Sequence, residues 1–102
     1  MNKIKDISKK FVEAVKRKGI PVSSAYLFGS YAKGNAKSYS DIDICIVSPK
    51  LGRNHFGEMF KLREISTYVD SRIEPFAFGP KDLDDKYSSL ASEIKKYGIS
   101  LI

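Results

Sequence analysis

Two short segments of the chain combine residue types that bind phosphate and divalent metals. The first is Gly29-Ser30, and the second, ten residues later, is Ser40-Asp41-Ile42-Asp43. In a β-strand successive side chains alternate between faces, so Asp41 and Asp43 would project from the same face. Two neighbouring carboxylates repel each other unless a cation lies between them, and hard oxygen ligands favour magnesium or manganese over zinc. The pattern predicts a divalent-metal site at the start of a strand.

The glycine-serine pair predicts a turn that can bind phosphate. A glycine presents its backbone N–H without a side chain in the way, and Gly29 directly follows the apolar segment from Val22 to Phe28. Either motif alone is common, and an Asp-X-Asp pair can simply be a solvated strand end. Together, with a strand before the turn, they indicate a nucleoside-triphosphate site.

A third carboxylate, Glu74, could join the pair. Glu74, Phe76 and Phe78 would share one face of a strand over about 72–78, as Asp41 and Asp43 do on theirs. Three carboxylates can hold two metal ions, one carried by the nucleotide and one lowering the pKa of an attacking hydroxyl. Glu74 could ligand the second metal or accept the proton. The opposing interpretation is a surface residue, because Pro75 can disturb the strand.

The elements that position these residues follow from apolar spacing and turn signals. We expect an amphipathic helix over about 3–18, a second helix through Met59 and Leu62, and a third from Leu83 to Tyr97 with Asp82 as its N-cap. Strands are expected over 22–28, 41–47 and 72–78, with one short helical turn over 31–33. The order α-β-(short α)-β-α-β-α predicts an α/β fold, a small mixed sheet of three or more strands flanked by helices. The second and third strands should be parallel, and the first antiparallel to the second.

Composition describes an ordinary folded domain. The 102 residues, with 42% apolar and 29% charged side chains, predict a single domain over residues 1–102 and a cytosolic, cytoplasmic location. No apolar run approaches membrane-spanning length. The one cysteine, Cys45, lies in an apolar run and is expected in the core. The net charge of +6 comes partly from lysines of the first helix, which indicate a solvated face more than a nucleic-acid surface.

The motifs resemble those of a known family. Leu27 to Gly34 and Ser40 to Ile44 resemble the nucleotidyltransferase motif of the DNA polymerase β superfamily, especially its minimal MNT-type members, and the likeness continues through Arg72–Phe76 and Glu93–Ile99. The resemblance implies transfer of a nucleoside monophosphate, usually AMP from ATP, to a hydroxyl. It implies the following roles: triphosphate contacts from Gly29, Ser30, Lys33 and Ser40, two Mg²⁺ ions (or Mn²⁺) held by Asp41 and Asp43, and Glu74 as the third acidic residue. Lys33 stands where many relatives have arginine, and Glu74 where aspartate is frequent.

Small MNT-type proteins are similar to antitoxins that adenylylate a tyrosine of a helical HEPN-type toxin, so the resemblance implies such a partner. An alternative is a non-catalytic module of the same fold that neutralises a toxin by contact, through the apolar tail Ile99, Leu101 and Ile102 or through the basic first helix. Transfer to a small molecule would need a further domain that these residues do not supply. A sequence-neutral nucleic-acid binder would leave the carboxylates without a role.

Overall fold

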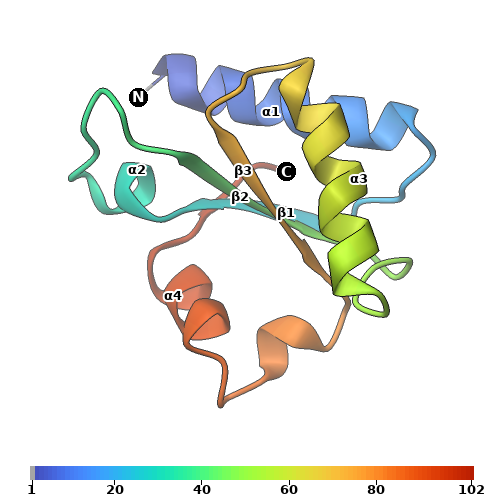
Figure 1. Ribbon diagram of the computed structural model, residues 1–102. Helices are drawn as coiled ribbons and strands as arrows, with labels where there is room; N and C mark the ends of the chain where they lie inside the picture. The colour runs from blue at the N-terminus through green and yellow to red at the C-terminus, as the bar shows by residue number, and fades with distance from the viewer. Residues whose placement is uncertain (1) are drawn as a thin grey trace.

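A computed structural model describes residues 2–102 and shows helices on both faces of one small sheet (Figure 1). The elements follow in the order α1 (Asn2–Arg17), β1 (Ser24–Phe28), α2 (Ser30–Lys33), β2 (Ile42–Val47), α3 (His55–Thr67), β3 (Ile73–Phe78), the 3₁₀ helix η1 (Asp82–Asp84), α4 (Ser89–Tyr97) and β4 (Ile99–Ser100). This confirms the predicted order and adds η1 and β4. Within the described residues, no helix combines the length and apolar character needed to cross a bilayer.

The sheet is mixed, as predicted, and its strand order is β3-β2-β1-β4. β2 and β3 run parallel, whereas β1 is antiparallel to both β2 and β4. Pro75 lies in the middle of β3, but the strand stays continuous, and Glu74 and Phe76 keep their register with Asp43 and Cys45. Because β3 is an edge strand, it can hold a proline without losing its pairing to β2. The prediction that Pro75 disturbs this strand was therefore wrong.

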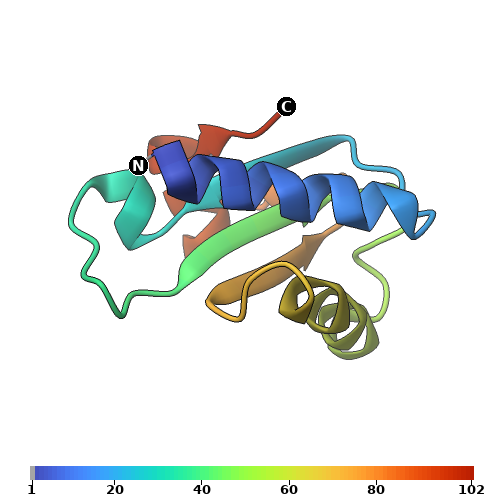
Figure 2. The same cartoon turned by 90° about the horizontal axis from the view of Figure 1, so that it is seen from above.

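Two apolar clusters fix the helices to opposite faces of the sheet. The first lies beneath α1 and α3, where Phe11 and Leu62 pack with Ile44 of β2. The second lies beneath α4, where Ile94 packs with Phe28 and Cys45. Figure 1 shows α1 above the strands and α4 below them, and Figure 2 shows α1 running across the strands with α3 beside β3.

Cys45 lies in the core, as predicted. Its side chain is fully buried. Burial, with a smaller effect of the Asp82 charge, raises the pKa of the thiol to about 12. A neutral, enclosed thiol has no role as a nucleophile.

The segment before α4 differs from the prediction. Asp82 was expected to cap a helix from Leu83 to Tyr97, but its Oδ2 accepts a hydrogen bond from the backbone N–H of Gly79 at 2.6 Å. α4 begins only at Ser89, and the Ser88 hydroxyl caps it by accepting from the N–H of Ala91 at 3.1 Å. Short acidic side chains bond to the nearby backbone and so compete with a continuous helix.

The C-terminal residues also differ from the prediction. Ile99 and Ser100 form β4, and the N–H of Leu101 donates to the carbonyl of Ala25 at 2.9 Å. Leu101 is buried in the first apolar cluster, and only Ile102 of the predicted tail is largely exposed. Leu101 is therefore not available for the toxin contact that the non-catalytic alternative assigned to Ile99, Leu101 and Ile102.

Candidate active site

The turn after β1 and the start of β2 meet at a single point. Gly29 has a φ of 75°, a conformation that side-chain-bearing residues rarely adopt. A Cβ placed on Gly29 would collide with Oδ2 of Asp43, because Phe28 and Asp43 are partners in the β1–β2 ladder. Only glycine suits this position, because the backbone has a positive φ and because the Asp43 carboxylate occupies the space that a Cβ would need. This contact joins the two motifs, which lie ten residues apart in the sequence.

Asp43 lies at the centre of a group of acidic side chains. In the parallel ladder it is the partner of Glu74, so both carboxylates stand on the sheet face that α4 covers farther along. Burial, then the charges of Asp41, Glu74 and Glu93, raise the pKa of Asp43 from 3.8 to about 6. Negative charge gathered around a half-buried carboxylate makes a site that a cation would stabilise.

Asp41 lies one residue before β2 rather than within it, and its side chain is exposed. The predicted strand began at Asp41, whereas pairing begins at Ile42, whose N–H donates to the carbonyl of Arg72 at 2.9 Å. Asp41 is therefore held less firmly than Asp43. A ligand at this position can adjust its direction to a bound ion.

Glu74 is engaged by a residue that sequence reasoning did not single out. Its Oε2 accepts from Nη2 of Arg63, on α3, at 2.7 Å. Among residues 2–102, no three His, Cys, Asp or Glu side chains are grouped so that they could ligate one ion. As the side chains stand, Asp41, Asp43 and Glu74 do not form the predicted three-carboxylate cage.

The residues present nonetheless fit a hard divalent cation. The donors around Asp43 are all carboxylate oxygens, which suit Mg²⁺ or Mn²⁺. Both partners of the Arg63–Glu74 pair are partly exposed, and such pairs contribute at most about 1 kcal/mol, so Glu74 can leave Arg63 at small cost.

Lys33 and Glu93 form a second ion pair at the site. Lys33 ends α2, and its Nζ lies 3.1 Å from Oε1 of Glu93 on α4 and 5.4 Å from the centre of the Tyr97 ring. The expected contact of Lys33 with phosphate stays a prediction; in this structure Lys33 balances the Glu93 carboxylate. Glu93 was not predicted as a site residue, because no spacing in the sequence relates α4 to Asp43.

Ser40 shapes the loop that leads into β2. Its Oγ accepts from the backbone N–H of Lys37 at 2.8 Å, and its own N–H donates to the Lys37 carbonyl at 3.1 Å. Of the two tyrosines near the motif, Tyr31 is half-buried against the first apolar cluster, whereas Tyr39 is 83% exposed. His55 is exposed at the first position of α3.

Residues 8–99 match the family model described as a nucleotidyltransferase domain, and the chain belongs to this family. The "Putative protein adenylyltransferase MJ1305" of Methanocaldococcus jannaschii is 33% identical over a match of 88 residues, and the match covers 81% of this chain and 60% of that protein. The "Probable protein adenylyltransferase MntA" of Haemophilus influenzae is 33% identical over 63 residues, or 58% of this chain and 55% of that protein. The chain thus spans somewhat more than half the length of these relatives.

Solved structures share the fold. A toxin-antitoxin structure with AMP-PNP superimposes with a TM-score of 0.65 at 23% identity, covering 92% of this chain and 72% of that one. A tri-AMPylated Shewanella oneidensis HEPN toxin in complex with MNT antitoxin gives a TM-score of 0.60 at 19% identity, covering 96% of this chain and 71% of that one. Together with the family match, these likenesses confirm the predicted nucleotidyltransferase fold.

Proposed function

We propose that this domain transfers a nucleoside monophosphate, AMP from ATP, to a hydroxyl group of a partner protein. The observation that carries the proposal is the contact of Gly29 with the Asp43 carboxylate, surrounded by the charges of Asp41, Glu74 and Glu93. A turn that presents backbone N–H groups to phosphate, in contact with a carboxylate that a cation would stabilise, suits a metal-bound triphosphate. The family match and the names of the two curated relatives support the same reaction.

The chain's own residues supply alignment and charge. Gly29 and Ser30 would bind phosphate oxygens through the backbone of the turn, while Asp41 and Asp43 would hold two Mg²⁺ ions together with Glu74. When bound, these ions would neutralise phosphate charge and make the acceptor hydroxyl more acidic. Glu74, once free of Arg63, is the carboxylate available to ligand an ion or to take the proton of the acceptor. Such transfer asks little of the protein beyond holding the reacting groups in line.

A HEPN-type helical protein is the partner that we propose, with a tyrosine as acceptor. The support is the solved complex of a tri-AMPylated HEPN toxin with an MNT antitoxin, which shares the fold of this chain. ATP as the donor is supported by the related fold solved with AMP-PNP.

The test is transfer of radiolabelled AMP from ATP to the product of the neighbouring reading frame, with Mg²⁺ present. We expect label on a tyrosine of the partner, and we expect Asp43→Asn and Asp41→Asn each to lower transfer by at least about a hundredfold. Asp6→Asn, the same change at an exposed position of α1, is the matched control and should leave transfer intact. An unlabelled partner would refute the acceptor. Full transfer by Asp43→Asn would refute the site.

The same variants distinguish catalysis from neutralisation by contact alone. If the toxin is silenced by AMP transfer, Asp43→Asn should abolish both label and protection. If protection survives without label, the non-catalytic module is the correct interpretation.

A further inference from the structure

A groove runs between α1 and α3, on the sheet face opposite the one on which Asp43 and Glu74 stand. It consists of three adjoining hollows of about 600, 260 and 300 Å³ that share lining residues. Tyr68 lines the first and the second, and Lys18 and Lys61 line the second and the third. We call this the basic groove, and its basic lining residues are Lys9, Lys10, Arg17, Lys18, Lys50 and Lys61.

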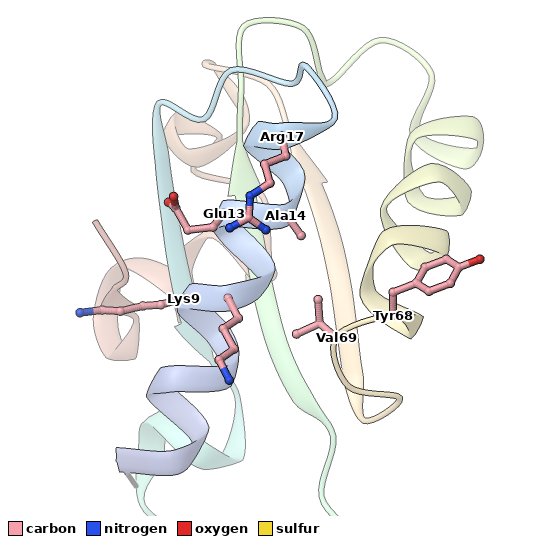
Figure 3. A pocket seen from close by; sticks show the side chains of 7 residues that line it. Lys9, Glu13, Ala14, Arg17, Tyr68 and Val69 are labelled. Atoms are coloured by element: carbon pink, nitrogen blue, oxygen red, sulfur yellow. The ribbon is translucent and has the colours of Figure 1, made fainter.

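The basic side chains of the basic groove outnumber its acidic ones and form no ion pairs within the described residues. Five ion pairs occur within the described part of the chain, and none of them includes any of these six side chains. Three glutamates also line the groove: Glu13, Glu58 and Glu64. Glu13 pairs with Lys16 at 3.2 Å, and Figure 3 shows its carboxylate pointing away from α3.

Glu58 is likewise engaged elsewhere. Its carboxylate accepts hydrogen bonds from the backbone N–H groups of Gly52, Arg53 and Asn54, at 2.8, 3.2 and 3.1 Å. The six basic and three acidic side chains that line the groove leave it with a formal net charge of +3, which is half of the chain's +6. A charged hollow of this kind attracts a polyanion.

The rest of the lining favours bases as well as phosphates. Tyr68 is 93% exposed and projects from the end of α3, while Ala14 and Val69 form an apolar strip between the two helices (Figure 3). Figure 3 shows the Tyr68 ring directed away from α1, at the outer side of the groove, where it offers a stacking surface for an unpaired base that leaves the hollows. The bases of a duplex are already stacked and could not stack on this ring, and an acidic peptide has no base to stack there.

We propose that the basic groove binds single-stranded nucleic acid, with phosphates on its lysines and Arg17 and a base stacked on Tyr68. The groove and the candidate active site lie on opposite faces of the sheet, so both can be occupied together. Nucleic acid is then a ligand in addition to the nucleotide substrate. The proposal therefore differs from the alternative considered in the sequence analysis, in which the protein binds nucleic acid and has no catalytic activity.

The test is fluorescence anisotropy with a labelled oligouridylate of about 12 nucleotides, titrated with the intact chain in about 50 mM and about 200 mM salt. If four or five phosphates are neutralised, the logarithm of the affinity should fall with the logarithm of salt with a slope of about −3. Lys18→Glu with Lys61→Glu should weaken binding at least tenfold. Tyr68→Ala should weaken it about fivefold or more.

The matched control is Lys95→Glu with Lys96→Glu on α4, which makes the same charge change outside the groove. It should alter affinity less than threefold, and circular dichroism should show all variants folded. Equal losses in the control and groove variants would overturn the proposal, because binding would then reflect net charge alone. Equal affinity for a duplex, or equal competition by polyglutamate with no effect of Tyr68→Ala, would also overturn it. The measurement involves no AMP transfer, so its failure leaves the proposed reaction untouched.

Discussion

Replacing Asp43 by asparagine should make the fold more stable while removing the proposed function. Folding raises the pKa of this carboxyl from 3.8 to about 6, so the folded state binds more protons than the unfolded state between these values. Stability must therefore fall as the pH rises from about 4 to about 6, and it must stay lowered above that. Asparagine carries no charge and avoids this loss.

The magnitude follows from the two pKa values. At about 1.4 kcal/mol per pKa unit, the difference corresponds to roughly 3 kcal/mol. Asp43 is only half-buried and water screens its charge, so we expect about 1–2 kcal/mol. For a domain of this size, that gain raises the melting temperature by roughly 5–10 °C.

The assay is thermal unfolding followed by circular dichroism in the absence of divalent cations, at about pH 4 and about pH 8. Asp43→Asn should melt well above the wild type at about pH 8, and the difference should largely disappear at about pH 4. Asp6→Asn is the matched control, because it makes the same change at an exposed position of α1 that does not affect the pKa of Asp43, and it should change the melting temperature little. Added Mg²⁺ should stabilise the wild type and not Asp43→Asn. An Asp43→Asn variant that is less stable than the wild type at about pH 8 would refute the electrostatic reasoning.

Three further substitutions test other features of the structure. Gly29→Ala places a side chain on a backbone with positive φ and against the Asp43 carboxylate. It should therefore lower the free energy of unfolding, measured in urea, by roughly 1–3 kcal/mol. A variant as stable as the wild type would contradict the described conformation of the turn. Glu58→Ala removes acceptors for three backbone N–H groups before α3 and should cost about 1–2 kcal/mol by the same measurement, whereas Glu64→Ala, at a position without these bonds, should cost little. Leu101→Ala should lower the free energy of unfolding by about 2–3 kcal/mol because its side chain is only 5% exposed. Ile102→Ala, at 64% exposure, should be nearly neutral. Equal effects of the two substitutions would contradict the position of β4 and the residues that follow it.

The sequence predicted the elements whose signals are local. The spacing of Phe11 and Val15 within α1, and the alternation through β2, depend only on neighbouring residues, and both elements formed as expected. β4 was not predicted because a strand of two residues carries no period, and its pairing partner Leu27 lies far away in the chain.

The candidate site shows the same division. Gly29 and Asp43 were singled out from motifs of a few residues, and the ladder brings them into contact. Arg63 and Glu93 were not, because each approaches the site from a helix whose rotation and depth depend on tertiary packing. No residue spacing in the sequence predicts that these two side chains lie near the site.

Pro75 has a consequence for how the molecule meets other copies of itself. Arg72 and Phe78 accept hydrogen bonds from β2, so by alternation the peptide groups of the odd-numbered residues of β3 face outward. The proline therefore leaves a gap among the outward N–H donors of this edge strand, and Pro75 itself is fully buried. A strand arriving from another molecule would find an incomplete and covered ladder there, which guards this edge of the sheet against aggregation by strand addition.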